Sequence, residues 1–348
     1  MDCDLITFGE AMVRLTSPDH MRLEQAETLE MSVGGAEWNV AVNVSRLGLR
    51  TAWVSRLVDN WSGRVIAAHA RRHGVDVSRI VWEPFDGVGR VRNGFYHLET
   101  GAGPRASSVT YDRGHSAVSG MTPDMVDWEE LLDGCRWLHS TGITPALSET
   151  LAYTVLELFE TASDLGVCIS YDLNYRGKLW TPEEAQEVNA RVVPYVEVLL
   201  GNEEDFEKCL GIKAAGTGED YSSLDPGSYE EVAREAMDRF PRVRMVGTTL
   251  RNAKSGLLND WRTLLYDGEQ VHLSRVYEDL ELVDRVGGGD SFASSIIYGM
   301  LQGWPTEEIC RFGAAYSALA HTFPGDINWA TEAEARGIMG GGTARISR

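Results

Sequence analysis

The chain has 348 residues, 43% of them hydrophobic, so it can bury a substantial core in one large α/β domain or two smaller ones. Its 52 acidic and 32 basic residues give a formal net charge of -20. This charge argues against nucleic-acid partners and anionic membranes, because both need a basic surface. A solvated acidic surface that aids solubility explains most of the carboxylates.

Cysteine and histidine usage gives no sign of a disulfide framework or a zinc site. The five cysteines are scattered and include no CxxC pair, and the eight histidines form no HExxH motif. No basic and apolar leader precedes the first apolar run, and no run approaches the roughly 18 apolar residues of a membrane span. These features predict a cytoplasmic protein without a membrane partner.

Short apolar runs recur along the chain, and helical patterns lie between them. In chain order, the predicted strands lie within residues 5–8, 51–57, 135–142, 167–174, 197–202 and 243–249. Intervening stretches such as 62–74 and 148–166 show helical spacing and stop at glycine. Repeated βα units of this kind predict an α/β fold with a doubly wound, mainly parallel sheet.

Two segments, residues 12–33 and 88–113, interrupt this rhythm with alternating apolar residues and turn residues. They predict a few antiparallel strands that stand off the main sheet as a small lid. The alternative is two ordinary surface hairpins. We expect residues 1–330 to form a single domain, and residues 331–348 to form the remnant of a helix and a flexible tail.

The stretch VGGGDSF, residues 286–292, places three glycines directly before a helical pattern. Gly287, Gly288 and Gly289 therefore occupy the turn into a helix N-terminus. Backbone N–H groups lack intrahelical partners there and the helix dipole is positive, so the turn attracts anions. Because glycine has no Cβ atom, a phosphate can approach this backbone closely.

Asp290 follows the glycines, where a carboxylate would repel a resting phosphate. It can instead accept the proton of an attacking hydroxyl while the N–H groups stabilise a transferring phosphoryl group. The alternative is an aspartate that only caps the helix. The sequence contains neither GxxxxGK[ST] nor a GxGxxG after a strand, which disfavours a P-loop NTPase and a dinucleotide dehydrogenase.

With these residues, the chain resembles the ribokinase-like, PfkB-type carbohydrate kinases, whose late signature DxxGAGD corresponds to DRVGGGD at 284–290. The stretch VGGAEWNVAVNVSRLG at 33–48 is similar to their early di-glycine signature. The resemblance covers about residues 4–330. It implies a three-layer α/β/α sandwich with a β-strand lid, Asp290 as the catalytic base, and Gly287, Gly288 and Gly289 as an anion hole.

Residues 139–147, 171–180 and 321–328 are most similar to the 2-keto-3-deoxygluconate kinases. This resemblance implies transfer of a phosphoryl group from ATP, with Mg²⁺, to the terminal hydroxyl of a six-carbon sugar acid. It also implies sugar contacts, which are Gly34, Gly35, Asn39 and the lid residue Tyr96.

A sugar acid carries a carboxylate, and on so acidic a chain its recognition calls for arginine. Arg176 follows the carboxyl end of the predicted strand at 167–174, where open parallel sheets bind ligands, and it matches the family's sugar-acid arginine. The alternative is an arginine paired with surface acids. Arg113 is the second candidate, but it stands one place away from the family's pattern, behind Asp112, which would orient it.

The residues expected to bind the nucleotide match the family's pattern less clearly than the sugar contacts do. Residues 201–211 resemble the family's NxxE element near the magnesium ion, with Asn202 at its start and Asp205 in place of glutamate. Asp205 is expected to hold Mg²⁺ through water, and an ordinary acidic helix start is the alternative. Residues 248–256 are interpreted as a lengthened nucleotide loop in which Thr248 and Arg251 contact ATP, and a monovalent cation near Asp284 is a further candidate cofactor.

The predicted enzyme takes a small sugar acid as its partner, and a homodimer through the lid is expected. Two alternatives remain open. One is a kinase for fructose, ribose or 2-keto-3-deoxygalactonate, and the other is a catalytically idle sugar sensor of the same fold. Arg176 and Arg113 discriminate against neutral sugars, which need neither arginine, and the intact GGGD at 287–290 speaks against the sensor.

Overall fold

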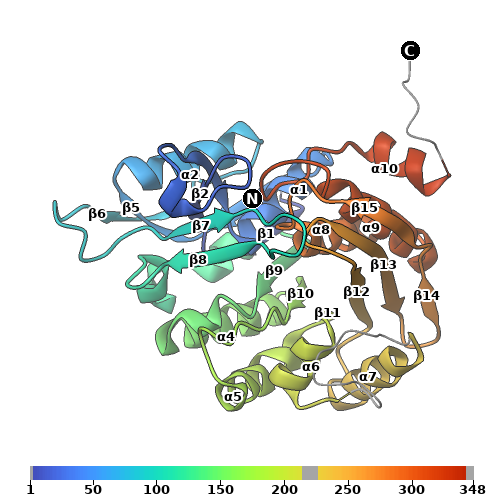
Figure 1. Cartoon of the computed structure of the whole chain (residues 1–348). Coiled ribbons are helices and arrows are strands. Elements are labelled where there is room, and N and C mark those ends of the chain that lie inside the picture. Colours follow the sequence, from blue (N-terminus) through green and yellow to red (C-terminus); the bar gives the residue numbers. More distant parts are fainter. Residues whose placement is uncertain (1–2, 214–225, 342–348) are drawn as a thin grey trace.

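A large sheet crosses the molecule, with helices on both of its faces (Figure 1). The computed structural model describes residues 3–213 and 226–341. In this part of the chain the strands of the large sheet are β1 (Leu5–Phe8), β4 (Thr51–Val54), β9 (Trp137–Thr141), β10 (Cys168–Asp172), β11 (Val198–Leu200), β12 (Met245–Ala253), β13 (Leu258–Tyr266), β14 (Val271–Leu273) and β15 (Tyr277–Glu281).

The order of these strands is β14-β13-β12-β11-β10-β9-β1-β4, and β15 lies beside β13. All neighbours from β4 to β12 pair in parallel, whereas β13 pairs antiparallel with β12, β14 and β15. β4, the next strand of this sheet along the chain, lies on one side of β1, and β9, the strand after it, lies on the other side. This reversal of strand order is typical of doubly wound sheets, where ligands bind at the carboxyl ends of the strands. The predicted doubly wound, mainly parallel sheet is confirmed.

Helices form a layer on each face of the sheet. One layer contains α1 (Ala36–Arg46), α2 (Trp61–Arg72), α8 (Gly288–Leu301) and α9 (Thr306–Ala320), with α10 (Glu332–Met339) packed on α9. The other contains α3 (Trp128–Leu132), α4 (Glu149–Asp164), α5 (Pro182–Val192), α6 (Glu203–Leu210) and α7 (Pro226–Arg239). Short 3₁₀ turns are η1 (Leu23–Gln25), η2 (Val118–Gly120), η3 (Pro123–Met125), η4 (Pro145–Leu147) and η5 (Val193–Tyr195).

Successive residues of the central strands pack into opposite layers. In β1, Leu5 belongs to the cluster that contains Phe292 of α8, whereas Ile6 belongs to the cluster that contains Leu158 of α4. Burial on both faces explains why these strands are short continuous apolar runs rather than alternating ones. Each fully buried aliphatic side chain contributes about 1.5–3 kcal/mol to this core.

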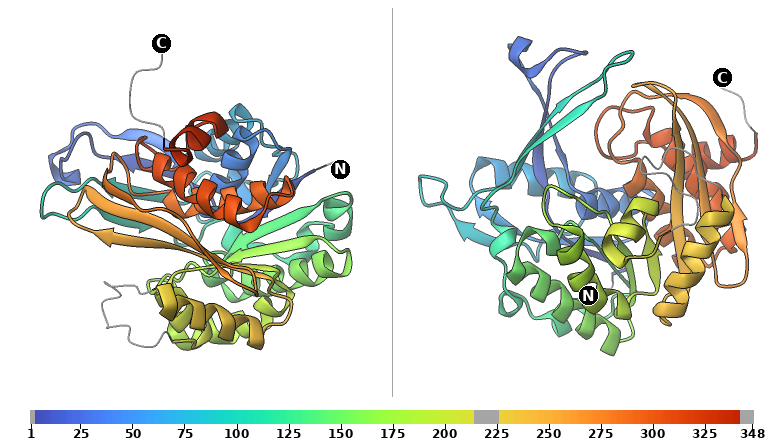
Figure 2. Two further views of the ribbon diagram at one scale, coloured as in Figure 1. Left: turned by 90° about the vertical axis from the view of Figure 1, so that its right-hand side faces the viewer. Right: turned by 60° about the horizontal axis from the view of Figure 1, so that its bottom comes forward.

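A second sheet, here called the lid sheet, stands off the main body. It consists of β2 (Met12–Thr16), β3 (Glu30–Gly34), β7 (Phe95–Glu99) and β8 (Ser108–Asp112), in the order β3-β2-β7-β8. These strands lie within or next to the two segments expected to form a lid, and their hairpins project from the body in the right-hand view of Figure 2. The β2–β7 pair is parallel, so the expectation of antiparallel pairing is wrong for the centre of this sheet. The hairpins come from separate parts of the chain, and the long connection between them permits parallel pairing.

Two boundaries differ from the prediction. The strand expected at 51–57 divides at Ser55, because β5 (Arg56–Asp59) leaves the large sheet and pairs with β6 (Val81–Pro84). The loop expected at 248–256 is mostly strand, because β12 continues to Ala253 and pairs with β13 along its length. Its β-branched threonines suit a strand.

Near the C-terminus, the expected helix is α10 (Glu332–Met339). The flexible tail predicted beyond it lies outside the described residues from position 342 on. Within the described ranges, no helix has both the length and the apolar character needed to cross a bilayer.

Candidate active site

The glycine turn, residues 287–289, leads directly into α8. Gly287 has φ 85° and ψ -4°, in the left-handed region, and a Cβ atom there would lie 1.9 Å from the backbone oxygen of Asp326. Both facts require glycine. The first helical hydrogen bond joins the Ser291 N–H to the Gly287 oxygen at 2.9 Å. Among the described residues, the N–H groups of Gly288, Gly289 and Asp290 have no hydrogen-bond partner, so three donors remain for a ligand.

Asp290 lies in the first turn of α8, beside this group of donors. Its Oδ2 accepts a hydrogen bond of 2.6 Å from the Nδ2 of Asn39, which lies on α1. Burial raises the pKa of Asp290 to about 7, while the Asn39 hydrogen bond and the charge of Arg176 act in the opposite direction. A carboxyl group with a pKa near neutrality is suited to general base catalysis.

A cleft of about 560 Å³ brings most of the predicted site residues together. The predicted residues that line it are Gly35, Asn39, Tyr96, Arg113, Arg176, Asn202, Asp205, Thr248, Arg251, Gly287, Gly288, Gly289 and Asp290. Gly34 lies behind the wall, where a Cβ atom would meet an Asp326 oxygen at 2.1 Å and the Tyr96 hydroxyl at 2.4 Å. Gly34 therefore permits close packing and is not part of the cleft surface.

Arg176 reaches the cleft from the loop that follows β10. Its guanidinium is exposed and donates through Nη1 to the Tyr175 backbone oxygen at 3.0 Å. It has no carboxylate partner in the described part of the chain. Burial raises the pKa values of Asp172, Asp205 and Asp290, and the charge of Arg176 acts in the opposite direction. A cation without a paired acid is available for an anionic ligand.

Arg113 also lines the cleft, but its charge is already paired. Its Nε contacts Glu10 Oε2 at 2.7 Å, and its Nη2 contacts the same oxygen. Asp112, expected to orient this arginine, instead pairs with Arg92 at 2.7 Å, so that expectation is wrong. Asp112 ends β8 and Arg113 follows it, and successive side chains of an extended chain point in opposite directions, which separates these two side chains.

A group of carboxyl side chains lines the opposite wall. Asp205 accepts backbone hydrogen bonds of 2.8 Å from Tyr175 and from Asn202, and it forms a capping box with Asn202 at the start of α6. These are the contacts of an acidic helix start, the alternative considered for Asp205. Sequence reasoning missed two neighbouring acids. Burial raises the pKa of Asp172 to about 8 and that of Glu203 to about 7, and the position of Asp172 at the end of a buried strand was the available signal.

Thr248 and Arg251, which were predicted to contact the nucleotide, extend from β12 into the cleft. Arg285, which precedes the glycine turn by two residues, lies nearby and was not predicted. Neither arginine forms an ion pair within residues 3–213 and 226–341, so both are available for an anion. Lys254 is not available for an anion, because its ammonium group pairs with Asp260 at 2.6 Å and with Asp279 at 2.8 Å. In these same ranges, no three or more acidic, histidine or cysteine side chains could hold a metal directly.

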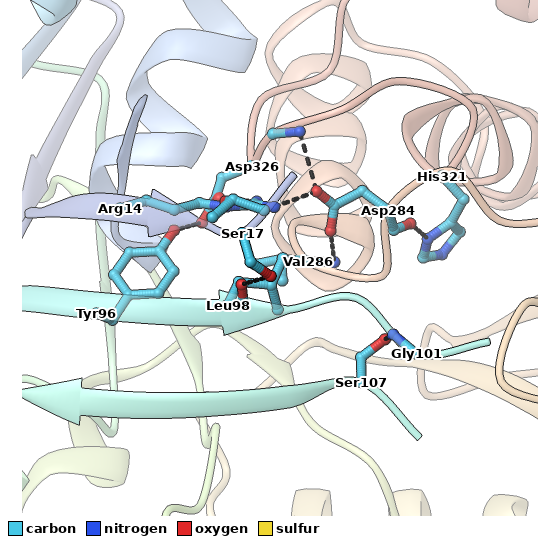
Figure 3. Close-up of polar contacts among 12 residues, drawn as sticks. Arg14, Ser17, Tyr96, Leu98, Gly101, Ser107, Asp284, Val286, His321 and Asp326 are labelled. Atoms are coloured by element: carbon cyan, nitrogen blue, oxygen red, sulfur yellow. Dashed lines mark hydrogen bonds and ion pairs between the residues drawn. The ribbon is translucent and has the colours of Figure 1, made fainter. Parts of the chain in front are cut away.

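Tyr96, predicted to touch the substrate, lines the cleft, and its hydroxyl is engaged by Asp326, which lines the same cleft. The hydroxyl donates to Asp326 Oδ2 at 2.6 Å (Figure 3). Asp326 also pairs with Arg14, at 2.6 Å, and Arg14 pairs with Asp284. Sequence reasoning missed Arg14 and Asp326, although an arginine inside the apolar run MVRLT, residues 12–16, was a signal.

Residues 3–333 match the pfkB family carbohydrate kinases, and the chain belongs to this family. The predicted family, fold class and carbohydrate kinase activity are therefore confirmed. A 2-dehydro-3-deoxygalactonokinase of Haloferax volcanii is 36% identical over 348 residues and 100% of both chains. The crystal structure of a 2-dehydro-3-deoxygluconokinase from Thermotoga maritima has a TM-score of 0.91 and 40% identity over 97% of this chain and 99% of that one.

A more distant structure shows the same fold. A putative ribokinase II from E. coli in complex with ATP and Mg²⁺ has a TM-score of 0.78 and 18% identity, covering 97% of this chain and 99% of that chain.

Proposed function

We propose that this kinase transfers the γ-phosphoryl group of ATP to the terminal hydroxyl of the sugar acid 2-keto-3-deoxygluconate (2-dehydro-3-deoxygluconate), giving its 6-phosphate. The proposal depends mainly on the guanidinium of Arg176, which has no acidic partner within the described ranges and lies in the cleft that also contains Asp290. On a chain with a formal charge of -20, an anionic sugar needs such a local cation. The names of the relatives from Haloferax volcanii and Thermotoga maritima support a sugar acid as the substrate.

In the proposed reaction, the oxygen of the terminal hydroxyl attacks the γ-phosphorus of ATP while Asp290 accepts the proton of that hydroxyl. The bond between the γ-phosphorus and the β-phosphate oxygen breaks, and ADP leaves. The N–H groups of Gly288, Gly289 and Asp290 stabilise the negative charge on the transferring group. Asn39 holds the Asp290 carboxyl at 2.6 Å and so fixes its direction. The lid sheet would close over the sugar and exclude water, which favours transfer over hydrolysis.

The proposed nucleotide contacts are Thr248, Arg251 and Arg285, because neither arginine is paired with an acid among the described residues and all three side chains line the same cleft. A bound Mg²⁺ would neutralise charge on the phosphates. Both oxygens of Asp205 already accept backbone hydrogen bonds, so its proposed contact with the ion is through water, which Mg²⁺ retains readily.

A second candidate substrate is 2-keto-3-deoxygalactonate, which differs at C4. The 36% identity to the Haloferax volcanii enzyme over the whole chain favours it. ADP release should be measured with ATP and Mg²⁺ on both sugar acids and on fructose and ribose. We expect kcat/KM for one of the sugar acids to exceed that for either neutral sugar by about 10²-fold or more. Similar values for all four would contradict a sugar-acid kinase, and no turnover with any would support the idle sensor.

Arg176→Ala tests directly whether the Arg176 guanidinium binds the carboxylate of the sugar acid. The variant is expected to raise KM for the preferred sugar acid by about 10-fold or more, because a charge-assisted hydrogen bond is lost. KM for ATP should change little. Lys178→Ala, an exposed cation of the same loop, is the matched control and should leave both KM values unchanged. An equal rise in KM for neutral sugars would show that Arg176 does not bind the carboxylate of the sugar acid.

A further inference from the structure

Arg14 is a buried cation within the lid sheet. It lies on β2, between Val13 and Leu15, and only 2% of its surface is exposed. Arginine is rarely buried to this extent unless it is paired. Its side chain does not line the cleft, so a direct contact with substrate does not explain it.

The guanidinium of Arg14 joins two carboxylates from the C-terminal part of the chain. Nη1 contacts Asp326 Oδ1 at 2.6 Å and Nη2 contacts Asp284 Oδ2 (Figure 3). Nε donates to Thr16 Oγ1 at 2.9 Å. Asp284 and Asp326 are 6% and 4% exposed. The planar fork of arginine allows one side chain to hold both acids.

Asp284 and Asp326 both lie next to the glycine turn. Asp284 accepts the N–H groups of Val286 at 3.1 Å and of Gly325 at 3.0 Å, which fixes the segment immediately before the turn. The backbone oxygen of Asp326 occupies the space where a Gly287 Cβ atom would lie. Asp284 thus holds the segment before the turn by hydrogen bonds, and the backbone of Asp326 packs closely against Gly287.

The lid sheet reaches this group through both of its central strands. Arg14 comes from β2, and the Tyr96 hydroxyl, which donates to Asp326 at 2.6 Å, comes from β7. Asp326 is therefore shared between the two lid hairpins and the wall of the turn. A movement of the lid sheet must strain these contacts or carry the turn with it.

We propose that Arg14 is a positioning residue that couples the lid sheet to the glycine turn, so that the N–H donors align on the phosphoryl group only when the lid sheet is in place. The inference rests on the proposed function of the turn as an anion hole. It assigns a role in turnover to a side chain outside the cleft. Loss of the fork should therefore lower kcat more than it raises KM.

The test compares Arg14→Lys with Arg22→Lys. Lysine keeps the charge but cannot bridge both carboxylates in one plane. Arg22 is the matched control in the same lid region, because it pairs with Glu99 at 2.8 Å while 51% of its side chain is exposed. We expect Arg14→Lys to lower kcat by about 10-fold or more with KM for the sugar changed less than about 3-fold, and Arg22→Lys to change neither.

Two further measurements separate coupling from plain stabilisation. Amide hydrogen exchange should become faster in peptides that cover the glycine turn and β7 in Arg14→Lys, while exchange in β10 stays unchanged. In Arg14→Ala, added guanidinium ions at concentrations well below denaturing ones should restore part of kcat, because the lost group can be supplied from solution. Arg22→Ala should show no such rescue.

The outcomes are distinct for the two proposals. A folded Arg14→Lys enzyme with the kcat and the exchange rates of the wild type would overturn the coupling. Failure of both Arg14 variants to fold would also overturn it, because the residue would then serve the stability of the whole domain. A wild-type enzyme inactive on sugar acids, with faster exchange at the turn in Arg14→Lys, would overturn the proposed substrate and leave the coupling supported.

Discussion

At the scale of single residues, the cleft contains two classes of acidic side chain. Glu10 is paired with the partly buried Arg113, so its charge is balanced. Asp290, Asp172 and Glu203 form no ion pair with a residue that the structure describes, and burial raises the pKa of each of them. The unbalanced acids surround the space where the proposed reaction takes place, and they give the enzyme a defined response to pH.

The first prediction concerns the pH profile. Because the pKa of Asp290 is about 7, the proposed base is protonated below that pH, and kcat/KM is expected to rise as pH increases through about 7. Asn39→Ala removes a hydrogen bond that lowers this pKa, so the acid limb should move to higher pH. Asn43→Ala, on the same helix, should leave the limb in place. An Asn39→Ala profile identical to that of the wild type would contradict this assignment.

The second prediction concerns the base itself. Asp290→Asn keeps the shape of the side chain but cannot accept the proton, so kcat should fall by roughly 10²–10⁴-fold. Binding of the sugar acid, measured by calorimetry, should remain within a few fold of the wild type. Turnover within threefold of the wild type would refute Asp290 as the base.

The third prediction concerns stability. The folded-state pKa of Asp172, about 8, lies above its ordinary value of 3.8. The protonated acid therefore favours the folded state below about pH 4, and this contribution is lost as pH rises through 8. Asp172→Asn should raise the free energy of unfolding at pH 9 by at least about 1.4 kcal/mol, one pKa unit, and by less at pH 5. Urea denaturation at both pH values measures this change in the free energy of unfolding, and Asp59→Asn, at an exposed site, is the control.

At the scale of elements, the sequence predicts well what depends on neighbouring residues. The first strand, β1, has the predicted bounds, and the glycines lead into α8. What it could not predict depends on distant pairing. The Arg14–Asp326 and Arg113–Glu10 pairs join positions 312 and 103 residues apart, and periodicity carries no information about which distant charges meet. The strand character of 248–253 likewise depends on β13.

The fourth prediction contrasts two glycines of the turn. Gly287→Ala should lower the free energy of unfolding by about 1–3 kcal/mol, because alanine resists a φ of 85° and its Cβ atom would meet the Asp326 oxygen. Gly289→Ala has no atom within 4 Å of its new methyl group, so stability should hold or rise. Thermal unfolding of both variants checks the contrast, and equal losses would contradict the different roles of the two positions.

At the scale of the whole molecule, the lid sheet presents apolar side chains to solvent. Met21, Leu29 and Met31, in and before β3, are 42%, 40% and 49% exposed. Apolar exposure of this kind is consistent with the expectation that a second copy of the chain covers the lid sheet, and this expectation stays a prediction.

The fifth prediction tests that expectation. Light scattering should give a mass of twice 38.5 kDa, and Met31→Glu should shift it toward one chain, because a charge would be buried in the interface. Asp19→Asn, in the same hairpin, should not change the mass. A wild-type mass of 38.5 kDa at micromolar concentration would contradict the prediction of a dimer formed through the lid sheet.

The ion pair between Arg14 and Asp326 has a consequence for protein synthesis. Because 312 positions separate the two residues, the guanidinium emerges from the ribosome long before its partner. Arg14 on β2 must therefore stay hydrated, without its Asp326 partner, while almost the entire polypeptide is translated. A product that terminates before position 326 lacks this contact, so nascent fragments of this kinase should be recognised by proteases and only the completed translation product should survive.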